Sequence, residues 1–249
     1  MIASTILGLL LTGMGAFFLQ TGRYLFTTEQ KLLINSDIRD FTNEMVENAR
    51  EANYFLLYRS FAARVRDGRT VQRDANANGT VNALDRRAAG QGGEFLVFVY
   101  YEDPFFDSRF YDGDPDNNAI VTSRVTRLVA YWVAPNREEP DEWALYRLDT
   151  DNFRSSSAAS SWATPWGVSF PATLGGATTL ETLLPPASAS EAQASYASVV
   201  VNDVEGLATE GDYFVNFQNR SILVRAKILH GNQAKRVTNT YNFTVTPRG

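Results

Sequence analysis

The chain has 249 residues, of which 44% are hydrophobic and 12% aromatic, so it is long and apolar enough to bury a sizeable core. Its formal net charge of −5 and its single His argue against a nucleic-acid partner, which requires a concentrated basic face. The absence of Cys excludes disulfides, thiolate metal sites and Cys nucleophiles.

The N-terminal segment differs from the rest of the chain in composition. No charged residue occurs from Met1 to Leu19, a length close to the roughly 20 apolar residues that cross a bilayer as a helix. A cleaved signal peptide is one alternative, but the segment has neither a basic start nor a small-residue cleavage site. Residues 1–24 are therefore predicted to form an apolar helical segment that lies in a membrane or a filament core.

Helical periodicity continues beyond this segment, which a simple membrane anchor followed by a linker does not explain. Apolar residues recur at intervals of three or four, with charged residues between them. These apolar positions are Ile34, Ile38, Phe41, Met45, Ala49, Ala52 and Phe55. We expect one helix from near Met1 to about Tyr58, about 85 Å long at about 1.5 Å per residue, whose amphipathic half (25–60) packs on a globular body.

The remaining segment, 61–249, shows short apolar runs and alternation of period two, which predict an antiparallel sheet. The predicted strands are 95–101, 125–133, 143–148, 198–201, 213–217, 222–228 and 240–245. Turns are expected at Pro135-Asn136 and Gly231-Asn232. The fold class is therefore α+β, with a long N-terminal helix packed on one face of a β-rich head.

Two stretches rich in Ser, Thr, Ala and Gly, 154–162 and 175–197, are predicted to be surface loops. Glycosylation of their hydroxyls is an open alternative. Four aromatic residues are candidates for contact with a sugar or a surface, or for closing a core or a subunit interface. They are Phe105, Phe106, Trp162 and Trp166.

A helix that is apolar at first, amphipathic afterwards and followed by a β-rich domain resembles the type IV pilins and the pseudopilins of type II secretion. The stretch Met1-Ile-Ala-Ser-Thr-Ile-Leu7 is similar to the residues that follow the mature start in that family. The chain thus looks as though it begins a few residues inside the usual start. Either residues precede Met1, or Met1 is the mature end and Thr5 occupies the position of the family's glutamate.

The resemblance implies a structural subunit of an extracellular pilus-like filament, held in the inner membrane before assembly. Its implied partners are copies of itself, other pilins and the inner-membrane assembly machinery, with no nucleic acid. The helix is expected to unwind near 11–15 in the assembled state, at Gly13 and Gly15, where glycine weakens a helix. The expected filament-core residues are Ile2, Ile6, Leu7, Leu9, Leu10, Leu11, Met14, Phe17, Phe18 and Leu19.

Two alternatives to a subunit repeated along a fibre stay open. One is a minor pilin or pseudopilin that primes assembly. The other is a periplasmic binding domain held by a single membrane-spanning helix.

The segment Asp74-Ala-Asn-Ala-Asn-Gly-Thr-Val-Asn-Ala-Leu-Asp85 places oxygen ligands in the order of an EF-hand calcium loop. A hard cation takes six to eight oxygens, and Gly79 at the sixth position permits the sharp turn. Its Asp terminus resembles the calcium loops of dockerin modules. The predicted ligands are Asp74, Asn76, Asn78, the Thr80 carbonyl, Asn82 and Asp85. The alternative is a turn held by side-chain to backbone hydrogen bonds.

A second acidic run, 112–118, also alternates oxygen side chains but has no glycine at the turn position. It is predicted to be an Asp-rich turn, with a second metal site as the alternative. Its candidate ligands are Asp112, Asp114, Asp116 and Asn118.

No sequence motif supports enzymatic chemistry, so the chain is predicted not to be an enzyme. His230 has no evident nucleophile partner, and neither a Gly-x-Ser-x-Gly elbow nor a phosphate loop occurs. The arginines at 64, 66, 69 and 73 form the one basic cluster, interpreted as a solvated flank with a polyanion patch as the alternative.

Overall fold

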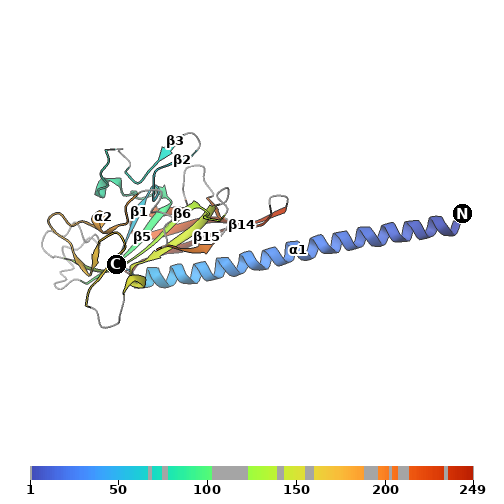
Figure 1. Ribbon diagram of the computed structural model, residues 1–249, viewed down its shortest axis with the longest axis horizontal. Helices are drawn as coiled ribbons and strands as arrows, with labels where there is room; N and C mark the ends of the chain where they lie inside the picture. Colours follow the sequence, from blue (N-terminus) through green and yellow to red (C-terminus); the bar gives the residue numbers. More distant parts are fainter. Residues whose placement is uncertain are drawn as a thin grey trace.

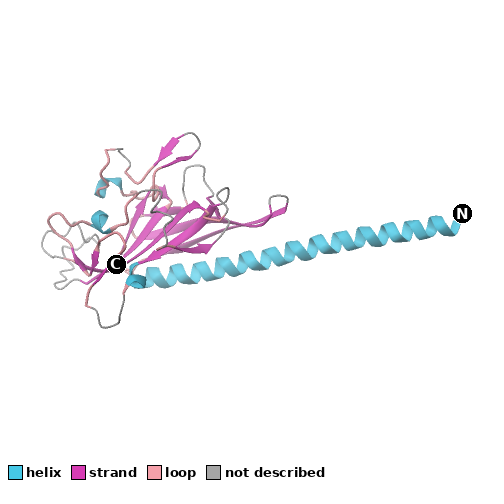
Figure 2. Cartoon of the chain, viewed as in Figure 1, coloured by secondary structure: helices cyan, strands magenta, loops and turns pink. Residues whose placement is uncertain are grey.

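The protein is represented by a computed structural model, which describes residues 2–66, 69–74, 78–102, 123–138, 143–154, 160–187, 196–201, 204–206, 213–232 and 235–248. A long N-terminal helix projects from a β-rich head, with the N-terminus at the far tip and the C-terminus beside the point where helix and head meet (Figure 1). Strands are confined to the head, and the projecting part of the chain is helical throughout (Figure 2). The α+β class is confirmed.

The helices and strands follow one another along the chain from a single long helix to a series of mostly short strands. They are α1 (Ile2–Glu51), β1 (Tyr54–Tyr58), β2 (Arg64–Arg66), β3 (Arg69–Val71), a 3-10 turn (Ala83–Asp85), β4 (Gly92–Gly93), β5 (Phe95–Glu102), β6 (Arg124–Pro135), β7 (Trp143–Asp149), a second 3-10 turn (Thr150–Phe153), β8 (Trp162–Ala163), β9 (Ser169–Phe170), β10 (Ala172–Thr173), α2 (Leu180–Leu183), β11 (Ser198–Val201), β12 (Val204–Gly206), β13 (Phe214–Phe217), β14 (Ser221–Asn232) and β15 (Lys235–Val245).

Two antiparallel sheets make up most of the described head. The first has the strand order β1-β5-β6-β7-β11, with β10 beside β6. The second has the order β12-β14-β13-β4, and β15 lies along the other side of β14. The sheets approach closely where Gly93 meets β1, because a Cβ at Gly93 would collide with the carbonyl of Tyr58. Glycine is therefore required at this contact.

The first sheet is buried on both faces, which explains why its strands are continuous apolar runs rather than alternating ones. In β5, Leu96, Phe98 and Tyr100 belong to a core shared with α1. Phe95 and Val97 belong to a second core on the opposite face. Period-two alternation thus distributes one apolar strand between two cores.

All seven predicted strands are confirmed within a few residues, and the predicted stripe of α1 is confirmed as the helix face that meets the head. Ile34, Phe41, Met45 and Ala49 are at most 1% exposed. Ile38 is partly buried against the same core. The amphipathic spacing therefore identified the contact face correctly. The predicted turn at Gly231-Asn232 is wrong, because both residues belong to β14 and pair with β15.

The helix ends earlier than predicted, at Glu51 rather than near Tyr58. The Asn53 amide donates to the Val99 carbonyl, and the Asn53 side chain accepts from the Tyr101 amide, so the chain has already joined the sheet. Residues 54–58 are aromatic and apolar, and they suit a strand that is buried on both faces. Phe55 lies in the core shared with α1 although it belongs to a strand, and its position also fits the helical spacing of the residues before it. The predicted helix was therefore too long.

The predicted surface loops are also partly wrong. Within 175–197, the short helix α2 and the residue after it place three leucines in the second core: Leu180, Leu183 and Leu184. Trp162 is 8% exposed, and its indole donates to the Thr150 carbonyl at 2.9 Å. Ser and Thr around these positions lowered the average hydrophobicity enough to hide the leucines. Residues 155–159 and 188–195 lie outside the described part of the chain.

Candidate interaction helix and candidate metal loop

The first half of α1 presents apolar side chains on all sides, and no other described element covers it (Figure 1). Exposure is 53% for Ile6, 60% for Leu10, 66% for Phe17 and 68% for Leu19. Burial of such residues elsewhere would be favourable by about 1.5–3 kcal/mol for each large side chain. The side chains of Ile2 and Leu9, also predicted to lie in the filament core, are outside the described set.

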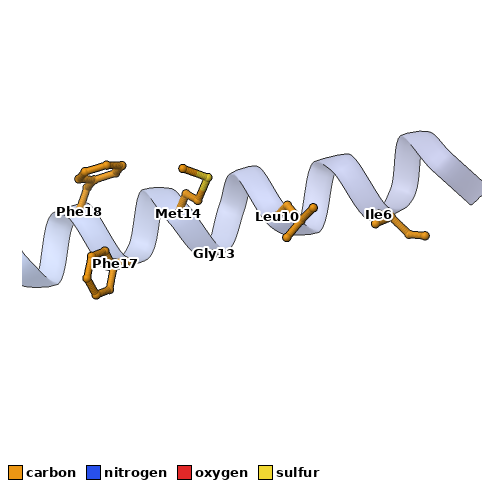
Figure 3. A pocket seen from close by; sticks show the side chains of 6 residues that line it. All are labelled: Ile6, Leu10, Gly13, Met14, Phe17 and Phe18. Atoms are coloured by element: carbon orange, nitrogen blue, oxygen red, sulfur yellow. The ribbon is translucent and has the colours of Figure 1, made fainter.

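Figure 3 shows how the side chains of this segment lie around the helix. Leu10, Met14 and Phe18 line a shallow groove together with Gly13, where the missing side chain opens the surface (Figure 3). Phe17 projects to a different side of the helix from Phe18. By length and composition α1 is able to cross a membrane.

Exposed apolar side chains continue beyond the length that a bilayer would cover. Tyr24 is 71% exposed, Leu25 61%, Leu32 65% and Leu33 46%. Charged residues, beginning with Arg23, are interspersed among them. These exposed side chains of α1 belong to a region that is not membrane-like in composition, and the described part of the head does not cover them.

The glycines of α1 lie in regular helix in the single chain. The helix is continuous through 11–15, and a Cβ added at Gly13 or Gly15 would meet nothing within 4 Å. The Thr12 hydroxyl donates to the Gly8 carbonyl at 2.8 Å, a bond that locally weakens helical geometry. Unwinding in an assembled state stays a prediction.

A buried polar network fixes the C-terminal third of α1 to the first sheet. The Tyr131 hydroxyl donates to Glu44 at 2.6 Å and accepts from the Asn48 amide at 2.7 Å. The Tyr100 hydroxyl donates to the Asn48 carbonyl at 2.9 Å. Burial, reinforced by the charge of Glu44, raises the pKa of Tyr131 and keeps its hydroxyl a donor. These bonds set the direction in which the apolar half of α1 leaves the head.

The described part of the 74–85 loop has the sharp turn that the calcium motif requires. Gly79 lies in the left-handed region at φ +82°, and its amide donates to the Asp74 carboxylate at 2.6 Å. Asp85 is 1% exposed and accepts the Asn82 amide at 2.8 Å, while Asn82 itself caps the 3-10 turn through Leu84. Both terminal carboxylates are therefore buried and held by the loop.

Whether the 74–85 loop suits a cation depends on how many of its side-chain oxygens can still accept a ligand bond beside their hydrogen bonds within the loop. Asn78 and Asn82 each accept one backbone amide, of Thr80 and Leu84 respectively, so the described residues satisfy the turn interpretation as well. A carboxylate has about four acceptor sites, so the amide bonds to Asp74 and Asp85 do not by themselves prevent these groups from coordinating a cation. Asn76 lies outside the described residues.

Across the described ranges, no three His, Cys, Asp or Glu side chains come together as a metal-binding group. The predicted ligand set of the 74–85 loop has only two acids and otherwise relies on amide and carbonyl oxygens, so it is not a group of this kind. The second acidic run, 112–118, lies within 103–122, which the structure does not describe.

The interpretation of the arginine cluster as a solvated flank is wrong for two of its members. Arg73 is 3% exposed, and Arg64 pairs with Glu94. The Arg73 guanidinium lies over the rings of Phe61 and Phe95, at 4.7 and 4.5 Å from their centroids. Burial lowers the pKa of Arg73 to about 10, which leaves it charged at neutral pH. Sequence alone carries no signal for such a site, because arginine is mostly exposed.

Comparison of the chain with protein-family models, with curated proteins and with solved structures finds no significant match.

Proposed function

We propose that this chain is a structural subunit of an extracellular filament of the type IV pilus kind, assembled by packing of N-terminal helices. The observation that carries the proposal is the uncovered apolar half of α1, joined rigidly to a folded head. Such a surface is stable in water only when a bilayer or other helices cover it. The inner membrane would cover it before assembly, and copies of the same helix afterwards.

The exposed side chains between Tyr24 and Leu33 favour a filament over a simple membrane anchor. A span of roughly 20 residues would bury the segment up to about Leu19 and leave Leu25, Leu32 and Leu33 in water. Neighbouring helices would cover these residues as well. A minor pilin or pseudopilin would use the same surface, with few copies rather than many.

A membrane-anchored binding domain is the second candidate, and one feature of the head favours it. A cleft of about 440 Å³ lies between β1, residues 83–88 and the turn after β13. Arg86, Arg87, Asn216 and Asn219 are among its lining residues. The volume suits a small polar ligand.

Thiol labelling of the Cys-free chain separates these functions. We expect Leu32→Cys to react with a membrane-impermeant maleimide in detergent and to be protected in sheared surface fibres seen by electron microscopy. Val65→Cys, on the head and 74% exposed, should react in both states, and Ala49→Cys, 1% exposed, in neither. Absence of fibres, with Leu32→Cys reactive in intact membranes, would exclude a subunit repeated along a fibre and support the anchored domain or a minor subunit instead.

We further propose that the 74–85 loop binds calcium, which would brace a head that has no disulfides. Asp74, Asp85 and the amide oxygens of Asn76, Asn78 and Asn82 would hold the ion together with the Thr80 carbonyl. When bound, calcium supplies charge neutralisation and cross-linking of the loop, and no chemistry. Calcium at millimolar concentration should raise the melting temperature of chelator-treated protein, and the Asp85→Asn variant should lose this increase; an unchanged wild-type melting temperature would exclude the site.

A further inference from the structure

The two ends of the 74–85 loop are attached to one distant piece of chain. Arg73 precedes the loop, and its guanidinium donates to the Pro185 carbonyl at 2.7 Å. Arg86 follows the loop, and its guanidinium donates to both oxygens of Glu181, at 2.7 and 3.2 Å. Glu181 and Pro185 both belong to the segment 180–185, which contains α2.

This segment is itself fixed in the second core. Leu180, Leu183 and Leu184 are at most 5% exposed. Glu181 also accepts the hydroxyl of Tyr58 at 2.8 Å, and Tyr58 is fully buried in β1. The anchor is therefore part of the rigid interior rather than a second mobile loop.

We propose that Arg73 and Arg86 are positioning residues that use segment 180–185 as a common anchor, holding Asp74 and Asp85 in place before a cation arrives. This inference rests on the proposed calcium site. Each arginine is adjacent in sequence to one terminal ligand, so fixing both guanidinium groups limits the separation of the two carboxylates. A preorganised loop loses less conformational entropy on binding and therefore binds more tightly.

The anchoring arginines are suited to this task for different reasons. Arg86 forms a bidentate pair, which fixes orientation as well as distance. Arg73 lies against the neighbouring rings of Phe61 and Phe95, where cation–π contact adds to its hydrogen bond. Neither needs to touch the ion, and both carry positive charge that would repel it, so their contribution would be geometric.

The test is calcium titration calorimetry on the full chain in detergent after chelator treatment, with Glu181→Gln as the variant. This change keeps the side-chain shape but removes the charge that holds Arg86. We expect calcium affinity to fall about 10-fold, the lower end of the losses seen when groups supporting metal ligands are altered. Asp149→Asn is the matched control, because it weakens the buried Arg127–Asp149 pair, which involves no loop residue.

Both variants should lower the melting temperature without calcium, but only Glu181→Gln should change calcium affinity. If Glu181→Gln fails to fold, Arg86→Lys takes its place, since lysine keeps the charge but cannot form the bidentate pair; its affinity should lie below that of the wild type. Equal affinities for wild type and variant would overturn the anchor while leaving the calcium site in place. A wild-type chain that binds no calcium would overturn both.

Discussion

Glu181 is a buried carboxylate with one cationic and one phenolic partner, Arg86 and Tyr58. Burial alone would raise the pKa of Glu181. The hydrogen bonds and charge of Arg86, together with the hydrogen bond from Tyr58, lower this pKa by a larger amount, so it lies below the ordinary value of 4.5. The ionised carboxylate therefore stabilises the folded state at pH values above its unfolded pKa. That stabilisation is lost as pH falls through the folded pKa.

Because the pKa of Glu181 is lowered in the folded state, the stability of the protein should depend on pH in a defined direction. The difference in unfolding free energy between wild type and Glu181→Gln should be constant above about pH 5 and should shrink below about pH 4. Denaturant titrations of both proteins across this range measure it, and the common background of other carboxylates cancels in the difference. A difference that grows on acidification would mean that the carboxylate is protonated in the folded protein.

The sequence does not predict which individual residues with polar groups are buried. Arg73 was predicted to lie in a solvated flank, and Trp162 in a surface loop with closure of a core as the alternative; both are buried. Their partners are the Pro185 and Thr150 carbonyls, groups that every residue carries, so no pattern of side chains identifies them. The loop ligands differ, because the turn glycine and the oxygen spacing are properties of the local sequence alone. The sharp turn at Gly79 was predictable for that reason.

Among the elements, α1 depends on its buried stripe for attachment to the head. Met45→Ala should destabilise the protein by about 2–5 kcal/mol, the cost of truncating a fully buried methionine. Val46→Ala is the matched control, because Val46 is the next residue of the same helix but is 41% exposed; its effect should stay within about 0.5 kcal/mol. Chemical denaturation measures both. Similar losses for the two variants would show that α1 does not pack by this stripe.

The accuracy of element prediction followed the strength of periodicity. The amphipathic part of α1 has a long, consistent helical pattern, and the seven strands are compact runs of β-branched and aromatic residues; the structure contains all of them. The end of α1 was missed because Phe55 satisfies both helical and strand spacing. The short helix α2 was missed because four residues are too few for a period to stand out among Ser and Thr, although the leucines at 180, 183 and 184 have helical spacing.

On the scale of the whole molecule, head and apolar helix present two different stability problems. The head has one core of its own and shares the other with α1, which is attached through Glu44, Asn48 and the buried stripe. The first half of α1 gains no stability from the head, so its sequence is free to suit other surroundings. Glycine in that half is then informative, because it lowers helix stability without any packing reason in the single chain.

Replacing Gly13 and Gly15 by Ala tests whether α1 unwinds at 11–15 when it passes from the membrane into the filament. Each substitution should favour helix by roughly 0.5–1 kcal/mol, and neither added methyl meets a neighbour within 4 Å. If the assembled state is unwound at 11–15, the double variant opposes assembly by about 1–2 kcal/mol, a factor of roughly 5–30. Fibre yield in sheared material should fall by this factor, while the amount of chain in the membrane stays the same.

Gly22→Ala is the control for a general effect of helix stability, because Gly22 also lies in open surroundings in α1 but outside 11–15. It should leave fibre yield unchanged. Equal yields from the double variant and the wild type, with helical dihedral angles at 11–15 in the fibre, would mean that the helix enters the filament without unwinding. The glycines would then matter for close approach of neighbouring helices, and the larger Ala side chain at these positions would widen the helix spacing instead of lowering the yield.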